Sequence, residues 1–203
     1  ERVPGRHRIL PRMLGDGLRC VTLPAGRDPA REETTSVFVP EGSHGDETPL
    51  FLLPGFGLDG RSFAYLRPLA TARPVAFWNP PNRLNGADDL DALARLALDH
   101  ATLAGMGARV ILGGASAGGA IALHAALLEP ERVVGLVLLG TLARWQDASG
   151  GVRAVAALHD LMPARWYHRM LPRILIPRRM DVAGGSPLND ALRTQMAHRT
   201  REF

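Results

Sequence analysis

The pentapeptide Gly114-Ala115-Ser116-Ala117-Gly118 constrains the fold of this chain more than any other feature. The residues before it, Arg109 to Gly113, have the apolar character of a short buried strand, and Gly119 to Leu128 have the composition of a helix. The serine therefore stands on a sharp strand-to-helix turn. A turn of this kind strains the backbone and needs small neighbours. Apart from Ser116 itself, all residues from Gly113 to Ala120 are glycine or alanine.

Such a turn exposes the serine hydroxyl and places the N-terminus of the following helix beneath it. The helix dipole and the free backbone N–H groups at that end favour a developing negative charge. A plain tight connection with no chemistry is the alternative interpretation, because a short motif is only a hypothesis until its context agrees. Here the flanking strand and helix agree with a reactive serine.

Strand-like and helical patterns alternate along the first two thirds of the chain. The strand-like runs lie at 18–23, 34–39, 50–53, 74–78, 109–113 and 133–139, and the helical patterns lie at 61–71, 88–103 and 119–128. This order predicts an α/β fold with a mainly parallel sheet and helices on both faces. The continuous apolar run Val133–Leu139 predicts a strand covered on both sides. Ligands of such sheets bind beyond the carboxyl ends of the strands, where Ser116 and the loop 54–57 fall.

The character of the chain changes after Gly140. Residues 141–203 contain no strand-like run of comparable quality, but they hold two of the three tryptophans and four of the six methionines. We expect residues 1–140 to form the core and residues 141–203 to form a helical cap, or lid, over the carboxyl edge of the sheet. Met162, Trp166 and Met170 are then candidates for an apolar substrate pocket. Ordinary packing between helices is the alternative.

The basic composition does not predict a nucleic-acid-binding protein. The formal net charge is only +4, and all 24 basic residues are arginine, a bias more typical of codon usage than of phosphate binding. An excess of arginine after residue 143 favours a solvated helical face over an attraction to anionic substrates or lipid surfaces.

The sequence predicts neither a membrane protein nor a disulfide-stabilised one. No run of residues has the length and apolar character of a transmembrane segment, and the N-terminus lacks the apolar core of a signal peptide, so we expect a cytoplasmic protein. The single cysteine, Cys20, excludes an internal disulfide and is expected to be a small buried thiol. No metal-ligand spacing is evident, and the weak glycine pattern from Gly55 to Gly60 lacks the acidic residue of a dinucleotide site.

Three pieces of the chain resemble the α/β-hydrolase superfamily, in its serine-nucleophile esterase and lipase-like branch. They are the strand and loop from Leu50 to Gly57, the pentapeptide around Ser116, and the segment from Glu129 to Leu139. The resemblance implies that Ser116 is the nucleophile and that the backbone N–H groups of Phe56 and Ala117 form the oxyanion hole. It also implies that no cofactor is needed. Many members have His-Gly where this chain has Pro54-Gly55, a position that does not supply the donor.

The resemblance leaves the acid and the base of the catalytic triad open. Members carry them after the serine, on two further strands. Asp147 follows the last strand-like run and is a candidate acid, with a loop or capping role as the alternative. His159, His168 and His198 lie in predicted helices and are weak candidates for the base. We therefore expect that these 203 residues lack the C-terminal strands of the fold and are inactive by themselves.

The chemistry implied is cleavage of a carboxylic ester, or of a thioester, lactone or amide, through an acyl-serine intermediate. The partner would be a small-molecule ester or acyl substrate, with an apolar group. An acyltransferase or a C–C bond hydrolase on the same scaffold is one alternative. A non-catalytic protein that uses the cleft only to bind a ligand is another.

Overall fold

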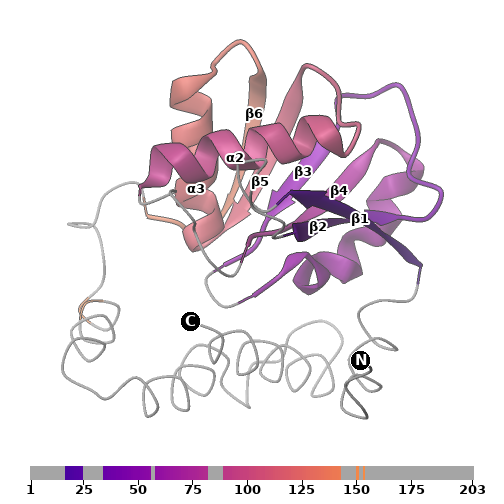
Figure 1. Ribbon diagram of the computed structural model, residues 1–203, viewed down its shortest axis with the longest axis horizontal. Helices are drawn as coiled ribbons and strands as arrows, with labels where there is room; N and C mark the ends of the chain where they lie inside the picture. The colour runs from indigo at the N-terminus through magenta and orange to yellow at the C-terminus, as the bar shows by residue number, and fades with distance from the viewer. Residues whose placement is uncertain are drawn as a thin grey trace. The chain divides into compact units, whose positions relative to one another are not determined.

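A computed structural model describes residues 17–24, 34–55, 58–81 and 89–142, together with Gly150 and Arg153 (Figure 1). The chain divides into two compact units according to its internal contacts. One is Gly17–Ala143, and the other consists of Glu1–Asp16 and Arg144–Phe203. The described secondary structure of the first unit is a six-stranded sheet with three helices. This unit carries the pentapeptide Gly114–Gly118.

The elements follow one another in the order that the sequence predicts. They are β1 (Leu18–Pro24), β2 (Thr34–Pro40), β3 (Leu50–Leu53), η1 (Gly60–Thr71), β4 (Val75–Asn79), α2 (Leu90–Leu103), β5 (Val110–Ala115), α3 (Ala117–Leu128) and β6 (Val133–Leu139). In space the strands lie in the order β1-β2-β4-β3-β5-β6. The first two pairings are antiparallel, and β4, β3, β5 and β6 are parallel to one another. The predicted α/β fold with a mainly parallel sheet is confirmed.

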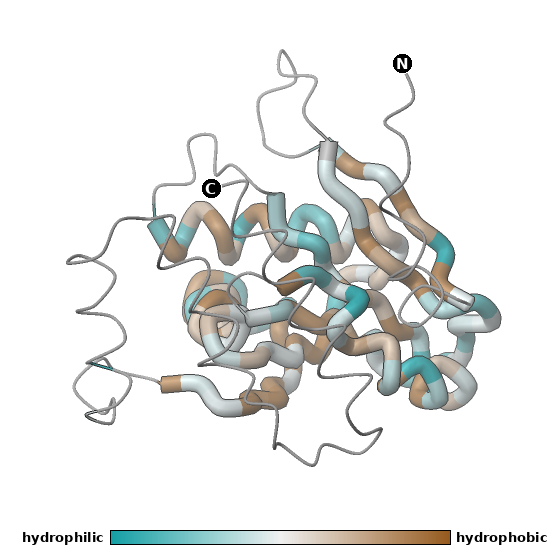
Figure 2. Tube along the Cα trace, turned by 90° about the horizontal axis from the view of Figure 1, so that it is seen from below, coloured by the Kyte–Doolittle hydropathy of each residue, from teal (hydrophilic) through white to brown (hydrophobic). Residues whose placement is uncertain are grey.

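Buried side chains form a core on each face of the sheet. One cluster joins Phe51, Leu53 and Trp78 to alanines and leucines of α2 and to Ile121 and Ala122 of α3. The other joins Leu52, Val75 and Phe77 to Phe63 and Ala70 of η1. Figure 2 shows the hydrophobic colouring of these central strands. Helices thus pack against both faces of the sheet, as predicted.

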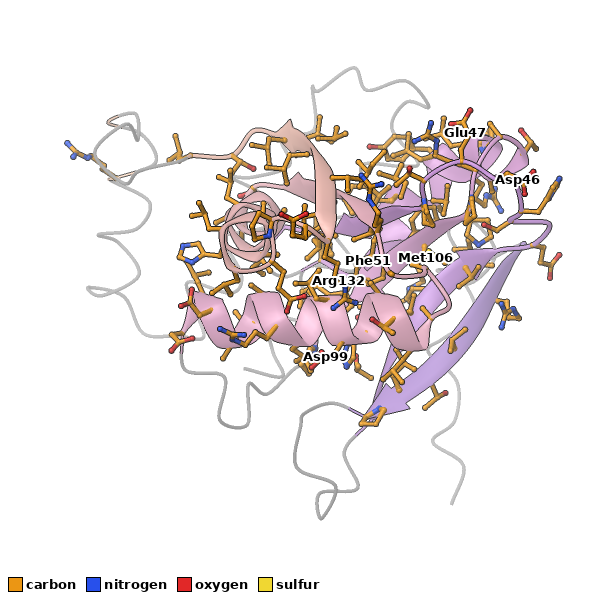
Figure 3. The ribbon with its side chains drawn as sticks, turned by 90° about the horizontal axis from the view of Figure 1, so that it is seen from above. Asp46, Glu47, Phe51, Asp99, Met106 and Arg132 are labelled. Carbon is orange, nitrogen blue, oxygen red and sulfur yellow. The ribbon has the colours of Figure 1, made fainter. Side chains whose placement is uncertain are left out.

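Helix α2 begins and ends where the sequence indicates. The Asp89 carboxylate accepts a hydrogen bond from the Ala92 N–H at 2.7 Å, which satisfies one of the free donors of the first turn. Gly105, just beyond the other end, has a φ of 82° that favours glycine. The Arg132 guanidinium donates to the Leu98 carbonyl at 2.7 Å, and Figure 3 shows Arg132 beside this helix. A cation near a helix C-terminus is favourable, so Arg132 fastens the start of β6 to α2.

The helix predicted at 61–71 is present but is of the 3₁₀ type. It begins after Asp59, whose carboxylate accepts from the Arg61 N–H at 2.9 Å and forms an ion pair with the Arg61 guanidinium at 2.6 Å. Pro68 lies inside the helix, where it cannot donate a backbone hydrogen bond. The Asp59 side chain is buried, and Arg61 also lies over the Phe38 ring of β2 at 5.7 Å. This pair fastens the loop after β3 to the sheet.

Two expectations about burial are wrong. Cys20 is exposed, because β1 is an edge strand and Leu23 is its one buried residue. Strand β6 is not covered on both sides, since Val137, Leu138 and Leu139 are each more than 40% exposed. Its place at the other edge of the described sheet is the reason. The sequence predicts an apolar strand here but does not reveal how far its neighbours cover it.

Among the residues described, no helix has both the length and the apolar character needed to cross a lipid bilayer.

Candidate active site

Ser116 lies at the junction between β5 and α3 with an unusual backbone conformation. Its φ is 51° and its ψ is −116°, and among the described residues no other non-glycine residue has a positive φ. Holding a side chain in such a sparsely populated region costs about 1–3 kcal/mol, and such residues cluster at functional sites. The predicted strained turn is therefore present at the predicted residue.

The two glycines of the pentapeptide are explained by close backbone packing. A Cβ on Gly114 would lie 2.4 Å from the Gly118 carbonyl oxygen, and a Cβ on Gly118 would lie 2.1 Å from the Leu53 carbonyl oxygen. Both distances are far below van der Waals contact, and both neighbours are backbone atoms that cannot move aside. The glycines therefore allow α3 to begin directly against β5 and the end of β3.

The Ser116 side chain does not cap the helix that follows it. The residue precedes α3, where a serine often caps the helix, yet its side chain makes no cap hydrogen bond. The residue is exposed. The next residue, Ala117, is the first of α3, and its N–H is one of those that have no partner within the helix. Ser116 and the backbone N–H of Ala117 thus both lie at the N-terminal end of a helix of 12 residues, which carries a partial positive charge.

The loop after β3 runs beside the serine. An ideal Cβ on Gly55 would lie 3.5 Å from the Ser116 Cβ, and the Leu58 N–H donates to the Gly55 carbonyl at 3.1 Å. Phe56, the expected second oxyanion donor, lies between these two residues and outside the described residues. The structure therefore brings Ser116, Ala117 and Gly55 together, as the sequence predicts, and the assignment of Phe56 stays a prediction.

The backbone of Ser116 is also tied to the end of β6. Its N–H donates to the Leu139 carbonyl at 2.9 Å, and its own carbonyl accepts from the Thr141 hydroxyl at 3.1 Å. Sequence reasoning missed Thr141. The signal that could have pointed to Thr141 is its position in the chain. It directly follows Gly140, just after β6, and β6 lies beside β5 in the sheet.

Two histidines among the described residues are used elsewhere. His124, on α3, pairs with Asp91 of α2 at 2.8 Å. This His–Asp pair lies eight residues beyond Ser116, a rise of roughly 12 Å along the helix, so it cannot serve the serine. His100 is buried between Trp78 and Pro24.

The other predicted site residues lie outside the described residues. These are Asp147 as the candidate acid, Met162, Trp166 and Met170 as the candidate pocket, and His159, His168 and His198 as candidate bases. They stay predictions. Within the described ranges, no three His, Cys, Asp or Glu side chains are grouped so that they could hold a metal ion.

Comparison with known proteins identifies the family. A model of the alpha/beta hydrolase family matches residues 50–202. The chain belongs to the alpha/beta hydrolase family. This membership supports a hydrolase. A search of the curated proteins found no match.

Solved structures share the fold at low sequence identity. A candidate epoxide hydrolase from Pseudomonas aeruginosa is 20% identical with a TM-score of 0.62, and the match covers 92% of this chain and 68% of that one. A bacterial membrane phospholipase A is 18% identical with a TM-score of 0.68, covering 92% and 60%. A candidate lipase from Acinetobacter baumannii is 16% identical with a TM-score of 0.71, covering 100% and 69%.

At such identities the likeness shows the fold alone. This alpha/beta hydrolase chain spans 60–69% of the length of those three proteins.

Proposed function

We propose that this protein is a serine hydrolase that cleaves a carboxylic ester, or a related thioester, lactone or amide, through an acyl-serine intermediate. The observation that carries the proposal is the strained backbone of Ser116, with φ at 51°, in an alpha/beta hydrolase chain. Strain of this kind persists only where the surrounding structure enforces it. Here the glycine packing and the ties to β6 do so.

In the proposed mechanism the Ser116 oxygen attacks the substrate carbonyl while a base takes its proton. The carbonyl oxygen becomes negative, and the N–H groups of Ala117 and Phe56 stabilise it. Removing one such donor costs about 3–4 kcal/mol in comparable sites. The leaving alcohol, thiol or amine takes the proton back, and water then releases the acid from the serine. Asp147 is the proposed acid of the triad, and the base follows it in the full-length protein.

The apolar residues beside the site support a substrate with an apolar group. Leu139 accepts from the Ser116 N–H through its carbonyl, and its side chain is 46% exposed. Leu142 follows three residues after Leu139 and is 37% exposed. An acyl chain or another apolar group could cover this surface. Met162, Trp166 and Met170 are proposed as further lining residues from a helical cap at 141–203.

Replacing the serine tests the proposal. Ser116→Ala in the full-length protein should reduce the hydrolysis of a p-nitrophenyl ester by at least about a thousandfold, because loss of a triad nucleophile costs on the order of a millionfold in turnover. A panel of thioesters, lactones and acyl acceptors would separate the hydrolase from an acyltransferase.

Ser36→Ala is the matched control. Ser36 lies on β2, separated from β5 by β4 and β3, roughly 14 Å across the sheet. This variant should keep the wild-type activity. Full ester hydrolysis by a folded Ser116→Ala variant would contradict the proposal.

A further inference from the structure

We propose that Thr141 is a positioning residue that aims the oxyanion donor of Ala117. The inference rests on the proposed function. Thr141 follows Gly140, which has a φ of 57° and turns the chain back after β6. That turn brings the threonine hydroxyl to 3.1 Å from the Ser116 carbonyl oxygen. The Leu139 carbonyl lies farther from the same hydroxyl, at 3.5 Å, so its one proton is better placed for Ser116.

The planarity of the peptide bond converts this contact into control of the oxyanion donor. The Ser116 carbonyl and the Ala117 N–H belong to one peptide unit, and no described peptide bond is cis. In a planar trans peptide the C=O and the N–H point in opposite directions. A bond that fixes the direction of the Ser116 carbonyl therefore also fixes the direction of the Ala117 N–H.

The threonine acts from outside the helix. The Ser116 carbonyl also accepts from the Gly119 and Ala120 N–H groups, at 3.0 and 3.4 Å, but these donors belong to the first turn of α3 itself. The Thr141 hydroxyl comes from the segment after β6. The peptide groups on both sides of Ser116 are therefore hydrogen-bonded to the chain around the end of β6. The Ser116 N–H donates to Leu139, and the Ser116 carbonyl accepts from Thr141.

Close packing against Gly119 holds the threonine side chain in place. A Cβ on Gly119 would lie 1.8 Å from the Thr141 Oγ1 and 2.7 Å from its Cβ. The threonine thus occupies the space that any larger residue at position 119 would need. This contact is independent of the hydrogen bond and explains why a third glycine follows the pentapeptide.

The test compares Thr141→Val, which keeps the shape but removes the hydroxyl, with Thr141→Ser, which keeps the hydroxyl. In the full-length protein we expect Thr141→Val to lower kcat for an ester roughly tenfold, with KM within about twofold. The loss is smaller than for a deleted oxyanion donor, because the N–H stays present and only its aim is lost. Thr141→Ser should stay within about threefold of the wild type.

A second measurement distinguishes a changed direction of the Ala117 N–H from a loss of folded protein. The affinity for a trifluoromethyl ketone, which forms a tetrahedral oxyanion on the serine, should fall in Thr141→Val by about the same factor as kcat. A purely structural role would lower the melting temperature and the active fraction without changing this affinity. If Thr141→Val does not fold, Thr141→Ala takes its place, because it also lacks the hydroxyl and can be compared with Thr141→Ser.

Two results would overturn the inference. One is wild-type kcat and inhibitor affinity in folded Thr141→Val. The other is an equal loss in Thr141→Val and Thr141→Ser. Both are distinct from a failure of the proposed function, which would appear as activity in Ser116→Ala.

Discussion

At the residue scale, the conformation of Ser116 carries most of the functional information in this chain. A φ of 51° disfavours any side chain, and the fold keeps one there. Glycine would be the natural residue for that backbone, so a serine at this position supports the proposal that its hydroxyl takes part in the reaction.

A stability measurement should reveal this strain directly. We expect Ser116→Gly to be more stable than Ser116→Ala by about 1 kcal/mol, since relief of about 1–3 kcal/mol of strain outweighs the extra freedom of glycine in the unfolded chain. In a chain of this size the gain corresponds to a melting temperature about 3 °C higher.

Ala117→Gly is the control for that comparison. Ala117 is the first residue of α3 and has no positive φ, so glycine there relieves no strain and should not raise stability. Equal melting temperatures for Ser116→Gly and Ser116→Ala would mean that the turn is not strained.

At the element scale, His100 joins three separate elements through one buried imidazole. The Trp78 indole of β4 donates to its Nδ1 at 2.9 Å, and its Nε2 lies 2.8 Å from the Pro24 carbonyl at the end of β1. His100 itself lies in α2. Because Nδ1 accepts and Nε2 donates, this arrangement needs the neutral ring. Protonation would place a second donor against the indole N–H.

Burial lowers the pKa of His100 below its usual value of 6.5, against the smaller raising effects of the Pro24 carbonyl and of Asp99. The unfolded chain therefore binds this proton more readily than the folded one. The stabilisation that the neutral His100 side chain contributes is complete above about pH 6.5. It is lost as the pH falls below that value, at up to about 1.4 kcal/mol per pH unit.

Urea denaturation at pH 7.5 and pH 5.5 tests this assignment. We expect the wild type to lose stability on acidification and His100→Gln to lose less, since glutamine cannot take up the proton. Ser36→Ala, which changes no titratable group, should lose as much stability on acidification as the wild type. An unchanged loss in His100→Gln would contradict the assignment.

At the scale of the whole molecule, much of the described fold follows from local patterns. The alternating strands and helices predict the element order because each pattern reflects one hydrophobic face or one turn. The pentapeptide predicts the strained serine, in part because Gly114 packs against the backbone of Gly118 within the same turn. The carboxyl-end rule of parallel sheets brings the Gly55 loop to the same edge.

Long-range placement is what the sequence could not supply. The exposure of Cys20 and of β6 depends on which strands lie at the edges of the sheet, and the strand order is not encoded in either run. The hydrogen bond from Thr141 to Ser116 joins residues 25 apart and depends on the turn after β6. The partners of the serine in a triad, with Asp147 as the proposed acid, remain predictions for the same reason.

The most direct test of the central claim is to locate a covalent label. The full-length protein is treated with a fluorophosphonate, digested with trypsin and analysed by mass spectrometry. The tryptic peptide Val110–Arg132 contains one serine, Ser116, and no threonine or tyrosine, so a label on it identifies the site without ambiguity. We predict stoichiometric labelling of this peptide and none in Ser116→Ala. A label on another peptide, or no label on a folded and active protein, would contradict the assignment of Ser116 as the nucleophile.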